Sequence, residues 1–301
     1  MKTSKDKMSV TVGIPTCYGG QSLVETVKSL RATQGGRDVT IIVTADRTPL
    51  SFEVKKQLKA LDVELHWNTV SGSQFKKIKQ MVKRAQSDIY ISTQDDITFD
   101  GEILNNVRSA FAQDPQLTMI GARVLPLVSR TTVEGALAVM IRLIDRVSGT
   151  WRNGVNYLAA NGRFLAFRTD HIKKLRFPEA VVNGDMFIYL ENKRLGGTFA
   201  QLKNGKVYIR PPQRLQDQIG PSSRFQFSQS EMRMYFGVGV AREYELPIRS
   251  LFRATIEQLV RRPSSTLLYV LIFLYSRLRR LPLSTVSNPL WTVDVTTKET
   301  K

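Results

Sequence analysis

The stretch SDIYISTQDDITFDGE, residues 87–102, joins a short apolar run to a group of acidic side chains. The run Ile89–Ile91 is typical of a buried strand, and the chain becomes polar directly after it. The acidic side chains that follow are Asp95, Asp96, Asp100 and Glu102. Because neighbouring carboxylates repel one another, a strand that ends in several of them indicates either a cation site or a solvated acidic turn.

Strand and helix patterns alternate on both sides of this stretch, between residues 9 and 124. The apolar runs predict strands at Val10–Ile14, Val39–Val43, Val63–Trp67 and Ile89–Ser92. Helical spacing between and after them predicts helices at Ser22–Ala32, Phe52–Leu61, Gln74–Ala85 and Ile103–Ala112. This alternation favours an α/β fold in which helices flank a Rossmann-like, mostly parallel mixed sheet.

The middle of the chain continues the pattern less regularly. Val133–Val147 has helical spacing. The sequence GRFLAFRTDHIKKL predicts a strand and then a helix that is capped by Thr169 or Asp170. Farther on, NGDMFIYLENKRLGG predicts a helix that has Asn183–Asp185 at its start and a Gly-Gly pair after its end.

A chain of 301 residues fits one large domain with an appendage better than two equal domains. We expect the main domain to cover residues 1–240 and a helical appendage, amphipathic and then apolar, to cover residues 241–287. The tail, residues 288–301, is expected to be loosely ordered.

Cysteine usage and the N-terminus bear on the compartment. The single cysteine, Cys17, excludes an intrachain disulfide and a cysteine-rich zinc site, and it indicates a reducing, cytosolic environment. The first residues include no long apolar segment before a cleavage site, which argues against a secretory signal. His66 and His171 are the only histidines and neither lies in a metal-binding motif, which disfavours a metallohydrolase.

The charge balance points to a polyanionic partner. Lys and Arg number 44 against 26 acidic residues, which gives a formal net charge of +18. Such a balance fits nucleic acid, an anionic membrane face or phosphorylated substrates. No helix-turn-helix, zinc-finger or aromatic RNA-binding signature accompanies it, so we do not expect nucleic acid to be the partner.

The segment between Pro247 and Pro282 carries seven arginines and one acidic residue. One face of a predicted helix there collects the apolar side chains Phe252, Ile256, Leu259 and Val260. The apolar run that follows, Leu267–Tyr275, is shorter than the roughly 20 residues that span a bilayer. We therefore expect these helices to lie in the cytoplasmic membrane interface, with arginines on lipid phosphates. A core-packing helix pair or a subunit interface is the alternative.

Polar residues follow three of the predicted parallel strands, at the end of the sheet where ligands bind. The first strand ends at Pro15–Gly20, the second at Asp46, and the fourth at Asp95 and Asp96. Three aligned strand ends favour one shared crevice over three unrelated polar loops. Mg²⁺ or Mn²⁺, held by these carboxylates and bridging to a diphosphate, would make the acidic cluster tolerable.

Four segments in this order resemble the pattern of glycosyltransferase family 2 on a GT-A fold: VGIPTCYGG, IIVTADRTP, SDIYISTQDDITF and VVNGDMFIYLENKRLGG. The resemblance covers about residues 8–240 and is to the membrane-associated type of the family. It implies an enzyme that moves a sugar from a nucleotide-diphosphate donor to an acceptor hydroxyl. It also implies a Mg²⁺ or Mn²⁺ cofactor.

The resemblance assigns residues at the first two strand ends to the nucleotide of the donor. Pro15, Thr16 and Tyr18 would line the base and ribose, and Asp46 would meet the base. The alternative for Asp46 alone is an ordinary polar loop residue.

The family's DxD-type motif falls on Thr93–Asp96, where this sequence departs from the pattern. The first acidic position is taken by Gln94 or Thr93, depending on the register. The resemblance implies that Asp95 is the first metal ligand and Asp96 the second, with Gln94 beside the donor.

A later family motif, often Glu-Asp at the start of a helix, falls on Gly184–Asp185. The Glu is missing, so Asp185 inherits the role of catalytic base towards the acceptor hydroxyl, whose proton must be accepted as the new bond forms. Direct attack of this kind inverts the anomeric configuration. The alternative role for Asp185 is purely structural, since an acidic residue in a first helical turn is stabilised by the helix dipole.

Basic residues are expected to hold the donor phosphates. The segment PSSRFQFSQSEMRMYFG resembles in position an arginine-containing segment of membrane-associated members, which makes Arg224 a candidate for a diphosphate contact. The alternative is an ordinary helix start. Lys76, Lys77 and Lys79, on the helix before the acidic strand, are further candidates, and Lys79 is assigned to the donor; the alternative for most of these lysines is a solvated basic face.

These observations predict a metal-dependent, inverting glycosyltransferase, peripheral on the inner face of the cell membrane. Its acceptor is expected to be a lipid-linked saccharide, a glycolipid or a surface polysaccharide. The alternatives are a sugar nucleotidyltransferase, which usually has an arginine in its first loop where GIPTCYGGQSLVET has none, and a catalytically degenerate membrane scaffold with the same fold. The sequence leaves the donor sugar, the base and the oligomeric state open.

Overall fold

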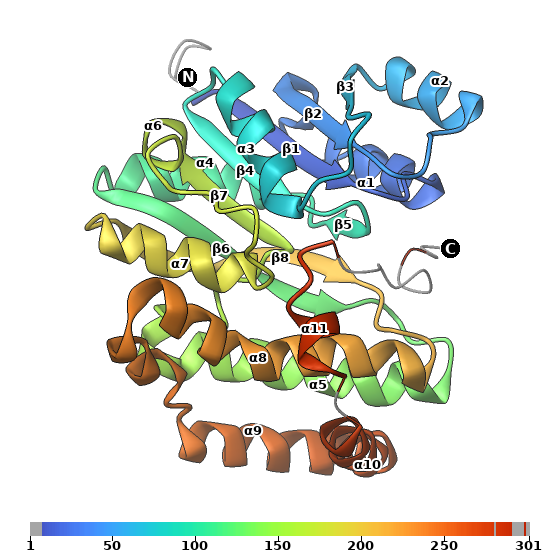
Figure 1. Cartoon of the computed structure of the whole chain (residues 1–301), viewed down its shortest axis with the longest axis vertical. Coiled ribbons are helices and arrows are strands. Elements are labelled where there is room, and N and C mark those ends of the chain that lie inside the picture. Colours follow the sequence, from blue (N-terminus) through green and yellow to red (C-terminus); the bar gives the residue numbers. More distant parts are fainter. Residues whose placement is uncertain (1–7, 280, 291–297, 299–301) are drawn as a thin grey trace.

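The computed structural model describes residues 8–279, 281–290 and 298, and it places one eight-stranded sheet among helices (Figure 1). In sheet order the strands are β3 (Val63–Trp67), β2 (Val39–Ala45), β1 (Val10–Thr16), β4 (Ile89–Thr93), β7 (Phe164–Arg168), β6 (Leu117–Pro126), β8 (Thr198–Ile209) and β5 (Ile97–Phe99).

The helices, in chain order, are α1 (Gln21–Arg31), α2 (Phe52–Ala60), α3 (Gln74–Arg84), α4 (Ile103–Gln113), α5 (Thr132–Thr150), α6 (Thr169–Ile172), α7 (Gly184–Arg194), α8 (Ile219–Phe236), α9 (Ile248–Arg261), α10 (Pro263–Leu278) and α11 (Leu283–Val286). Short 3-10 turns lie at Gly36–Asp38, Trp151–Gly154, Leu215–Gln218 and Val238–Tyr244.

The predicted mostly parallel mixed sheet is confirmed. β3, β2, β1 and β4 run parallel to one another, and β6 is parallel to β8. β7 is antiparallel to both β4 and β6, and β5 is antiparallel to β8. β7 therefore joins the parallel half of the sheet to the other half, and the strand ends of the two halves meet beside the loop between β4 and β5.

The sheet buries a core on each face, which explains why β1 and β4 are buried along their whole length. One core contains the apolar sides of α1 and α4, with Leu23, Val27 and Phe111 fully or almost fully buried. The other contains α3 and α7, with Phe75 and Phe187 packed edge to face. Because both faces of the sheet are covered, even the polar residues of β1, Thr11 and Thr16, are buried.

Most predicted elements are observed with small shifts at their ends. The strand Val63–Trp67 has the predicted bounds, and β1 continues to Thr16. α7 begins at Gly184 as predicted. The predicted cap of α6 is wrong: Thr169 is already inside the helix, and Arg168 precedes it without a capping side-chain bond. The backbone N–H of Thr169 instead donates to the carbonyl oxygen of Asp88, so the helix starts directly where β7 leaves the sheet.

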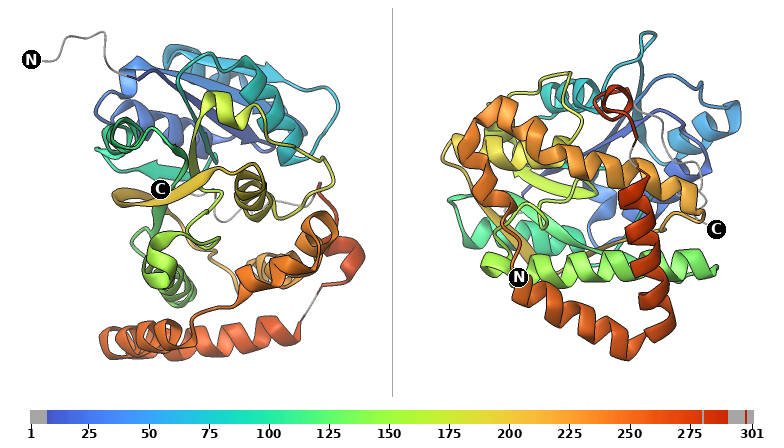
Figure 2. Two further views of the ribbon diagram at one scale, coloured as in Figure 1. Left: turned by 90° about the vertical axis from the view of Figure 1, so that its left-hand side faces the viewer. Right: turned by 60° about the horizontal axis from the view of Figure 1, so that its bottom comes forward.

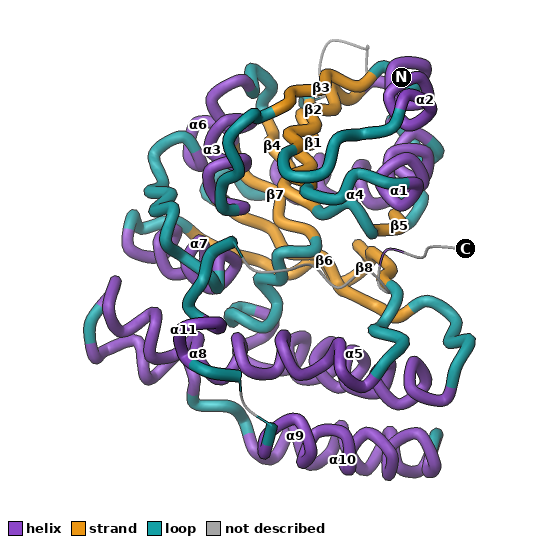
Figure 3. Tube along the Cα trace, turned by 45° about the vertical axis from the view of Figure 1, so that its right-hand side comes forward, coloured by secondary structure: helices purple, strands orange, loops and turns teal. Residues whose placement is uncertain are grey.

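The C-terminal helices form a further layer. α5 begins with a capping box between Thr131 and Glu134 and packs on β6. α9 and α10 pack on the other side of α5, and α8 also contacts α10. Figures 1 and 3 show α9 and α10 as the layer farthest from β1 to β3, and Figure 2 shows how the two helices meet at an angle below α5 and α8. Within the described residues, no helix is long and apolar enough to cross a bilayer.

Candidate functional site

A cavity opens at the carboxyl ends of β1 and β4, where these strands face α5 and α8. The β1 end contributes Pro15, Thr16 and Cys17, and the loop after β4 contributes Gln94, Asp95 and Asp96. Its far wall comes from α5, from the Pro-Pro segment after β8 and from the start of α8, through Met140, Ile141, Arg210, Pro211, Pro221 and Arg224. The predicted crevice at the strand ends is therefore present, although the second strand contributes only Arg47 to its wall.

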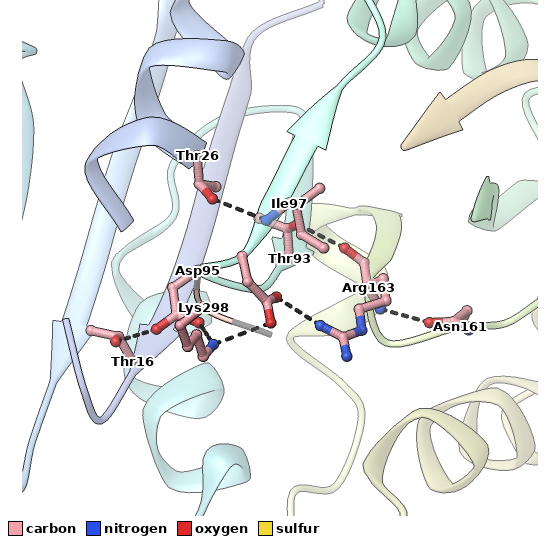
Figure 4. Close-up of polar contacts among 9 residues, drawn as sticks. Thr16, Thr26, Thr93, Asp95, Ile97, Asn161, Arg163 and Lys298 are labelled. Carbon is pink, nitrogen blue, oxygen red and sulfur yellow. Dashed lines mark hydrogen bonds and ion pairs between the residues drawn. The ribbon is translucent and has the colours of Figure 1, made fainter. Parts of the chain in front are cut away.

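Asp95 and Asp96 line this cavity from the turn between β4 and β5. Figure 4 shows Asp95 between Thr16 and Lys298. Both residues are 4% exposed. The Thr16 hydroxyl donates to Asp95, and Arg163 Nη1 donates to Asp96 Oδ1 at 2.7 Å. Burial alone would raise the pKa of Asp96, but Arg163 and Lys298 outweigh it and hold the pKa at about 2. This carboxylate is thus charged at any physiological pH.

The ammonium group of Lys298 lies between the two carboxylates. Its Nζ forms an ion pair with Asp95 and lies 3.4 Å from Asp96 Oδ2. Burial lowers the pKa of Lys298, yet the two carboxylates raise it more, so the net shift is upward. Of the predicted tail, residues 288–301, the structure also describes 288–290, and residues 291–297 and 299–301 lie outside the described residues. Lys298 occupies the place where the two carboxylates attract a cation.

The donor set of this place fits a hard divalent ion. It consists of two carboxylates beside a threonine hydroxyl, and Mg²⁺ and Mn²⁺ prefer oxygen ligands of this kind. No cluster of three or more His, Cys, Asp or Glu side chains suited to a metal occurs among the described residues. An ion at Asp95 and Asp96 would therefore take its remaining ligands from water or phosphate, as Mg²⁺ commonly does.

Backbone and side-chain bonds hold the acidic turn in place (Figure 4). The Thr26 hydroxyl of α1 accepts from the backbone N–H of Ile97 at 3.0 Å, just after the acidic pair. The Thr93 hydroxyl, just before the pair, donates to the carbonyl oxygen of Arg163 at 2.7 Å. Asn161 Oδ1 accepts from the backbone N–H of Arg163 at 3.0 Å. The turn and the Arg163 guanidinium are thereby fixed relative to each other.

Asp46 does not line the cavity. Its carboxylate is completely buried, where Oδ1 accepts from Lys77 Nζ at 2.8 Å and Oδ2 accepts from the backbone N–H of Gly72 at 2.9 Å. Lys77, 3% exposed, reaches the cavity wall from α3. The family resemblance assigned Asp46 to the nucleotide base. In the structure its carboxylate instead forms a buried ion pair with Lys77, which donates to Oδ1.

The structure also separates the lysines of α3. Lys79 is exposed and does not line the cavity, so the expectation that it faces the donor phosphates does not fit its position. Lys77, two positions earlier, points to the opposite side of the helix and is buried. Residues two apart on a helix do not share a face, which is the physical reason for the difference.

Asp185 lies in the first turn of α7, and its position depends on the residue before it. A Cβ on Gly184 would come within 2.5 Å of the Phe75 ring of α3, so no larger side chain fits there without moving the ring. This contact explains why position 184 holds a glycine. Asp185 Oδ1 accepts from the backbone N–H of Met186 at 2.9 Å, and Oδ2 accepts from that of Gly162 at 3.3 Å.

The charge state of Asp185 is set mainly by burial, which raises its pKa, while the N–H groups of Met186 and Gly162 oppose the shift. Arg224 on α8 interacts electrostatically with both Asp185 and Arg163. Burial and the neighbouring Arg163 lower the pKa of Arg224 to about 10. Arg163 and Arg224 both line the cavity, so Asp185 lies next to its wall.

The loop before α7 is held by Glu231 of α8, which is 2% exposed. Its carboxylate accepts from the backbone N–H groups of Val182 and Asn183, at 2.7 and 3.0 Å. Asn183 adds a side-chain bond to Glu231 at 2.7 Å. α8 therefore positions Asp185 as well as supplying Arg224.

Of the predicted nucleotide contacts, Pro15, Thr16, Gln94 and Arg224 line the cavity. Tyr18 is half-buried in the next loop and is not part of the wall, whereas its neighbour Cys17 is.

Sequence reasoning missed four cations that the fold brings to the cavity: Arg47, Arg163, Arg210 and Lys298. Lys77, which also lines it, was among the lysines considered for the phosphates. Arg210 directly follows β8, and it pairs with Glu134 of α5 at 3.0 Å, with both side chains buried. Arg163 directly precedes β7. A basic residue next to a predicted strand was a signal available for Arg163, whereas no strand was predicted before Arg210.

No protein-family model and no curated protein matches the sequence. The fold, however, resembles solved glycosyltransferase structures. A mannosyltransferase from Pyrobaculum calidifontis, in complex with GDP-Man and Mn²⁺, matches with a TM-score of 0.57 and 13% identity, over 91% of this chain and 87% of that chain. S. aureus TarS matches with a TM-score of 0.51 and 15% identity, over 72% of this chain and 39% of TarS. The chain therefore has a GT-A fold.

Proposed function

We propose that this protein is a metal-dependent glycosyltransferase that takes its sugar from a nucleotide-diphosphate donor. The observation that carries the proposal is the pair Asp95 and Asp96, buried at the end of β4 and holding a cationic group, Lys298, in the cavity. Two fixed carboxylates beside several arginines suit a ligand that combines a divalent cation with phosphates. The P. calidifontis mannosyltransferase of the same fold was solved with GDP-Man and Mn²⁺, which supports this choice of ligands.

The residues of the cavity would divide the donor between them. Pro15, Thr16 and Gln94 would lie against the nucleoside, and Arg163 and Arg224 would bind phosphate oxygens through their planar guanidinium groups. Asp95 and Asp96 would hold Mg²⁺ or Mn²⁺, which when bound neutralises the diphosphate leaving group.

Asp185 would accept the proton of the acceptor hydroxyl. Its raised pKa makes the Asp185 carboxylate a stronger base than an exposed carboxylate. The positive charges of Arg163 and Arg224 nearby stabilise its ionised form, which is the form that accepts a proton. A single direct displacement of this kind inverts the anomeric configuration.

We further propose that the acceptor is a lipid-linked saccharide, a glycolipid or a surface polysaccharide, met at the inner face of the cell membrane. The support is the C-terminal pair α9 and α10, which exposes both apolar side chains and arginines. The protein would be peripheral on that membrane.

The alternative function is a membrane scaffold with the same fold and no turnover. Calorimetric titration with UDP and GDP, with Mn²⁺, Mg²⁺ or EDTA, tests the enzyme. We expect metal-dependent binding of one nucleotide. The Asp95→Asn variant should lose it, whereas Glu102→Gln, an exposed carboxylate of the same acidic stretch, should retain it. Absence of binding under either metal would exclude the donor site and favour the scaffold.

A further inference from the structure

α9 exposes a row of apolar side chains on the side that faces away from the body of the protein. Ile248, Phe252, Ile256 and Val260 follow one another at steps of four, and they are 79%, 66%, 42% and 78% exposed. Side chains at this spacing lie along one face of a helix. A row of four large exposed apolar side chains is unusual on a surface that meets only water.

α10 continues this surface. Leu267, Leu271, Leu274 and Leu278 recur at helical spacing and are 60%, 63%, 53% and 85% exposed. Together with the four residues of α9 they form what we call the outer face, the layer seen at the bottom of Figure 1.

The outer face is held rigidly because the opposite sides of both helices are anchored to α5. Ala254 of α9 packs with Val139, Leu143 and Val147 of α5. Ile272 of α10, 5% exposed, packs with Ala136 and Leu137 of α5. One side of each helix is therefore buried against α5, and the exposed rows on the other side have no contact with the rest of the described chain that buries them.

Arginines run beside the apolar row of α9. Arg249, Arg253 and Arg261 each follow a member of that row by one position, and all three are exposed. The position after the remaining member of the row, Ile256, is Glu257, which forms ion pairs with Arg146 at 3.2 Å and Arg261 at 3.1 Å.

At the other end of the outer face, arginines lie on aromatic rings of α10. Arg277 lies over Phe273 at 4.9 Å and Arg279 over Tyr275 at 5.9 Å from the ring centroids. This pattern of apolar rows with arginines at the edge is typical of helices that lie in a membrane interface.

We infer that the outer face seats the protein on an anionic lipid bilayer, with α9 and α10 lying in the interface. Charge complementarity decides between the possible partners. A second copy docked on the same face would bring arginine rows towards arginine rows, whereas anionic lipid offers phosphates to the arginines and acyl chains to the apolar rows. The role of this contact in catalysis rests on the proposed function, because it places a lipid-borne acceptor at the enzyme.

The helices that carry the outer face also line the cavity. α5 and α8 contribute Met140, Ile141, Pro221 and Arg224 to the cavity wall, and the same two helices carry α9 and α10 on another side. Two layers of packed helices, α9 with α10 and then α5 with α8, therefore lie between the outer face and the site, and the axes of packed helices are about 8–10 Å apart.

Vesicle co-sedimentation of the full chain tests the inference, using phosphatidylcholine vesicles with and without phosphatidylglycerol, at low and high salt. We expect binding to the anionic vesicles that weakens with salt and is much weaker on neutral vesicles. Phe252→Glu should reduce it by about tenfold or more, because it removes an apolar contact and adds a negative charge. The matched control is Phe52→Glu on α2, where the native ring is 83% exposed.

A second pair of variants isolates the charge. Arg249→Gln with Arg253→Gln should reduce binding to anionic vesicles by about tenfold or more. Lys55→Gln with Lys56→Gln, exposed on α2, removes the same net charge elsewhere and should leave binding within about twofold. If both double variants lost vesicle binding equally, the binding would depend only on the net charge of the protein and not on the outer face, which would overturn the inference.

Light scattering after gel filtration covers the competing partner. A stable dimer that Phe252→Glu dissociates, in a protein that ignores anionic vesicles, would overturn membrane docking and identify a subunit interface. Nucleotide titration of the same variants keeps this result separate from the proposed function. Vesicle binding without metal-dependent nucleotide binding would leave docking intact and refute the enzyme, and the converse result would refute docking alone.

Discussion

The side chains of Lys298 and Asp95 form an ion pair inside the cavity, although 203 residues separate them in the sequence. Two cations close together repel each other, so a divalent ion at Asp95 and Asp96 has to displace the Lys298 ammonium group. Lys298 would therefore compete with a bound metal ion for the same two carboxylates.

Removing the Lys298 ammonium group should tighten metal binding. In Lys298→Ala, we expect the Mn²⁺ concentration that gives half-maximal nucleotide binding to fall by about tenfold, equivalent to ~1.4 kcal/mol. Lys203→Ala, which removes an exposed lysine on β8 outside the cavity, is the control and should change nothing. An unchanged Mn²⁺ requirement in Lys298→Ala would mean that Lys298 does not compete with the metal.

Arg163 should matter for the diphosphate rather than for the nucleoside. Replacing it by Gln in Arg163→Gln removes a charge-assisted donor from the cavity and from Asp96. We expect affinity for the nucleoside diphosphate to fall by about tenfold or more, with a smaller effect on the nucleoside. Calorimetry with both ligands measures the difference, and Arg37→Gln at the exposed Gly36–Asp38 turn serves as the control. Equal losses for both ligands would contradict a phosphate contact.

Asp46 and Lys77 should act as a structural pair. Asp46→Asn leaves a buried ammonium group without its counter-charge, and breaking such a pair costs about 3–5 kcal/mol of unfolding free energy. The double variant Asp46→Asn with Lys77→Met removes both charges and should recover much of that loss. Urea unfolding measures all three proteins. If Asp46→Asn keeps its stability and instead changes the preference between UDP and GDP, Asp46 reads the base.

The sequence predicted local structure well because its signals are local. The apolar runs of β1 to β4 and the helical spacing of α1 to α4 depend on residues a few positions apart, and the observed bounds differ from the predicted ones by only one or two residues at most ends. The acidic turn at Asp95 and Asp96 was found for the same reason.

The contacts that complete the site are not local. Arg163 meets Asp96 because β7 runs antiparallel between β4 and β6, and the sequence before β7 does not encode that order. Lys77 and Lys79 lie two positions apart in a basic helix, and only packing against the sheet decides which one is buried. Patterns within one segment thus predict its type, while the partners of its side chains depend on the topology.

Asp185 has two possible roles, catalytic base and helix-dipole partner, which predict different effects of mutation on turnover and stability. Burial raises its pKa above the usual value of 3.8, and the carboxylate must be deprotonated to act as a base. Turnover should therefore fall as the pH decreases through this raised pKa, so the acid limb of the rate profile lies above pH 3.8.

Stability should move the other way. The folded protein keeps the Asp185 proton to a higher pH than the unfolded chain does, so unfolding free energy falls as the pH rises from 3.8 to the raised pKa. Asp185→Asn removes this titration. A catalytic base predicts that the variant loses about 10²–10⁴-fold in turnover of the nucleotide-sugar, with nucleotide affinity and neutral-pH stability retained.

The helix-dipole role predicts a different result for the same variant. If Asp185 only stabilises the start of α7, Asp185→Asn should cost about 0.3–1 kcal/mol of unfolding free energy and leave turnover unchanged. Asp170→Asn is the matched control, since Asp170 is an exposed acidic residue in the first turn of α6. Turnover, thermal unfolding and nucleotide titration of the two variants separate the roles, because only a base loses turnover while keeping both affinity and stability.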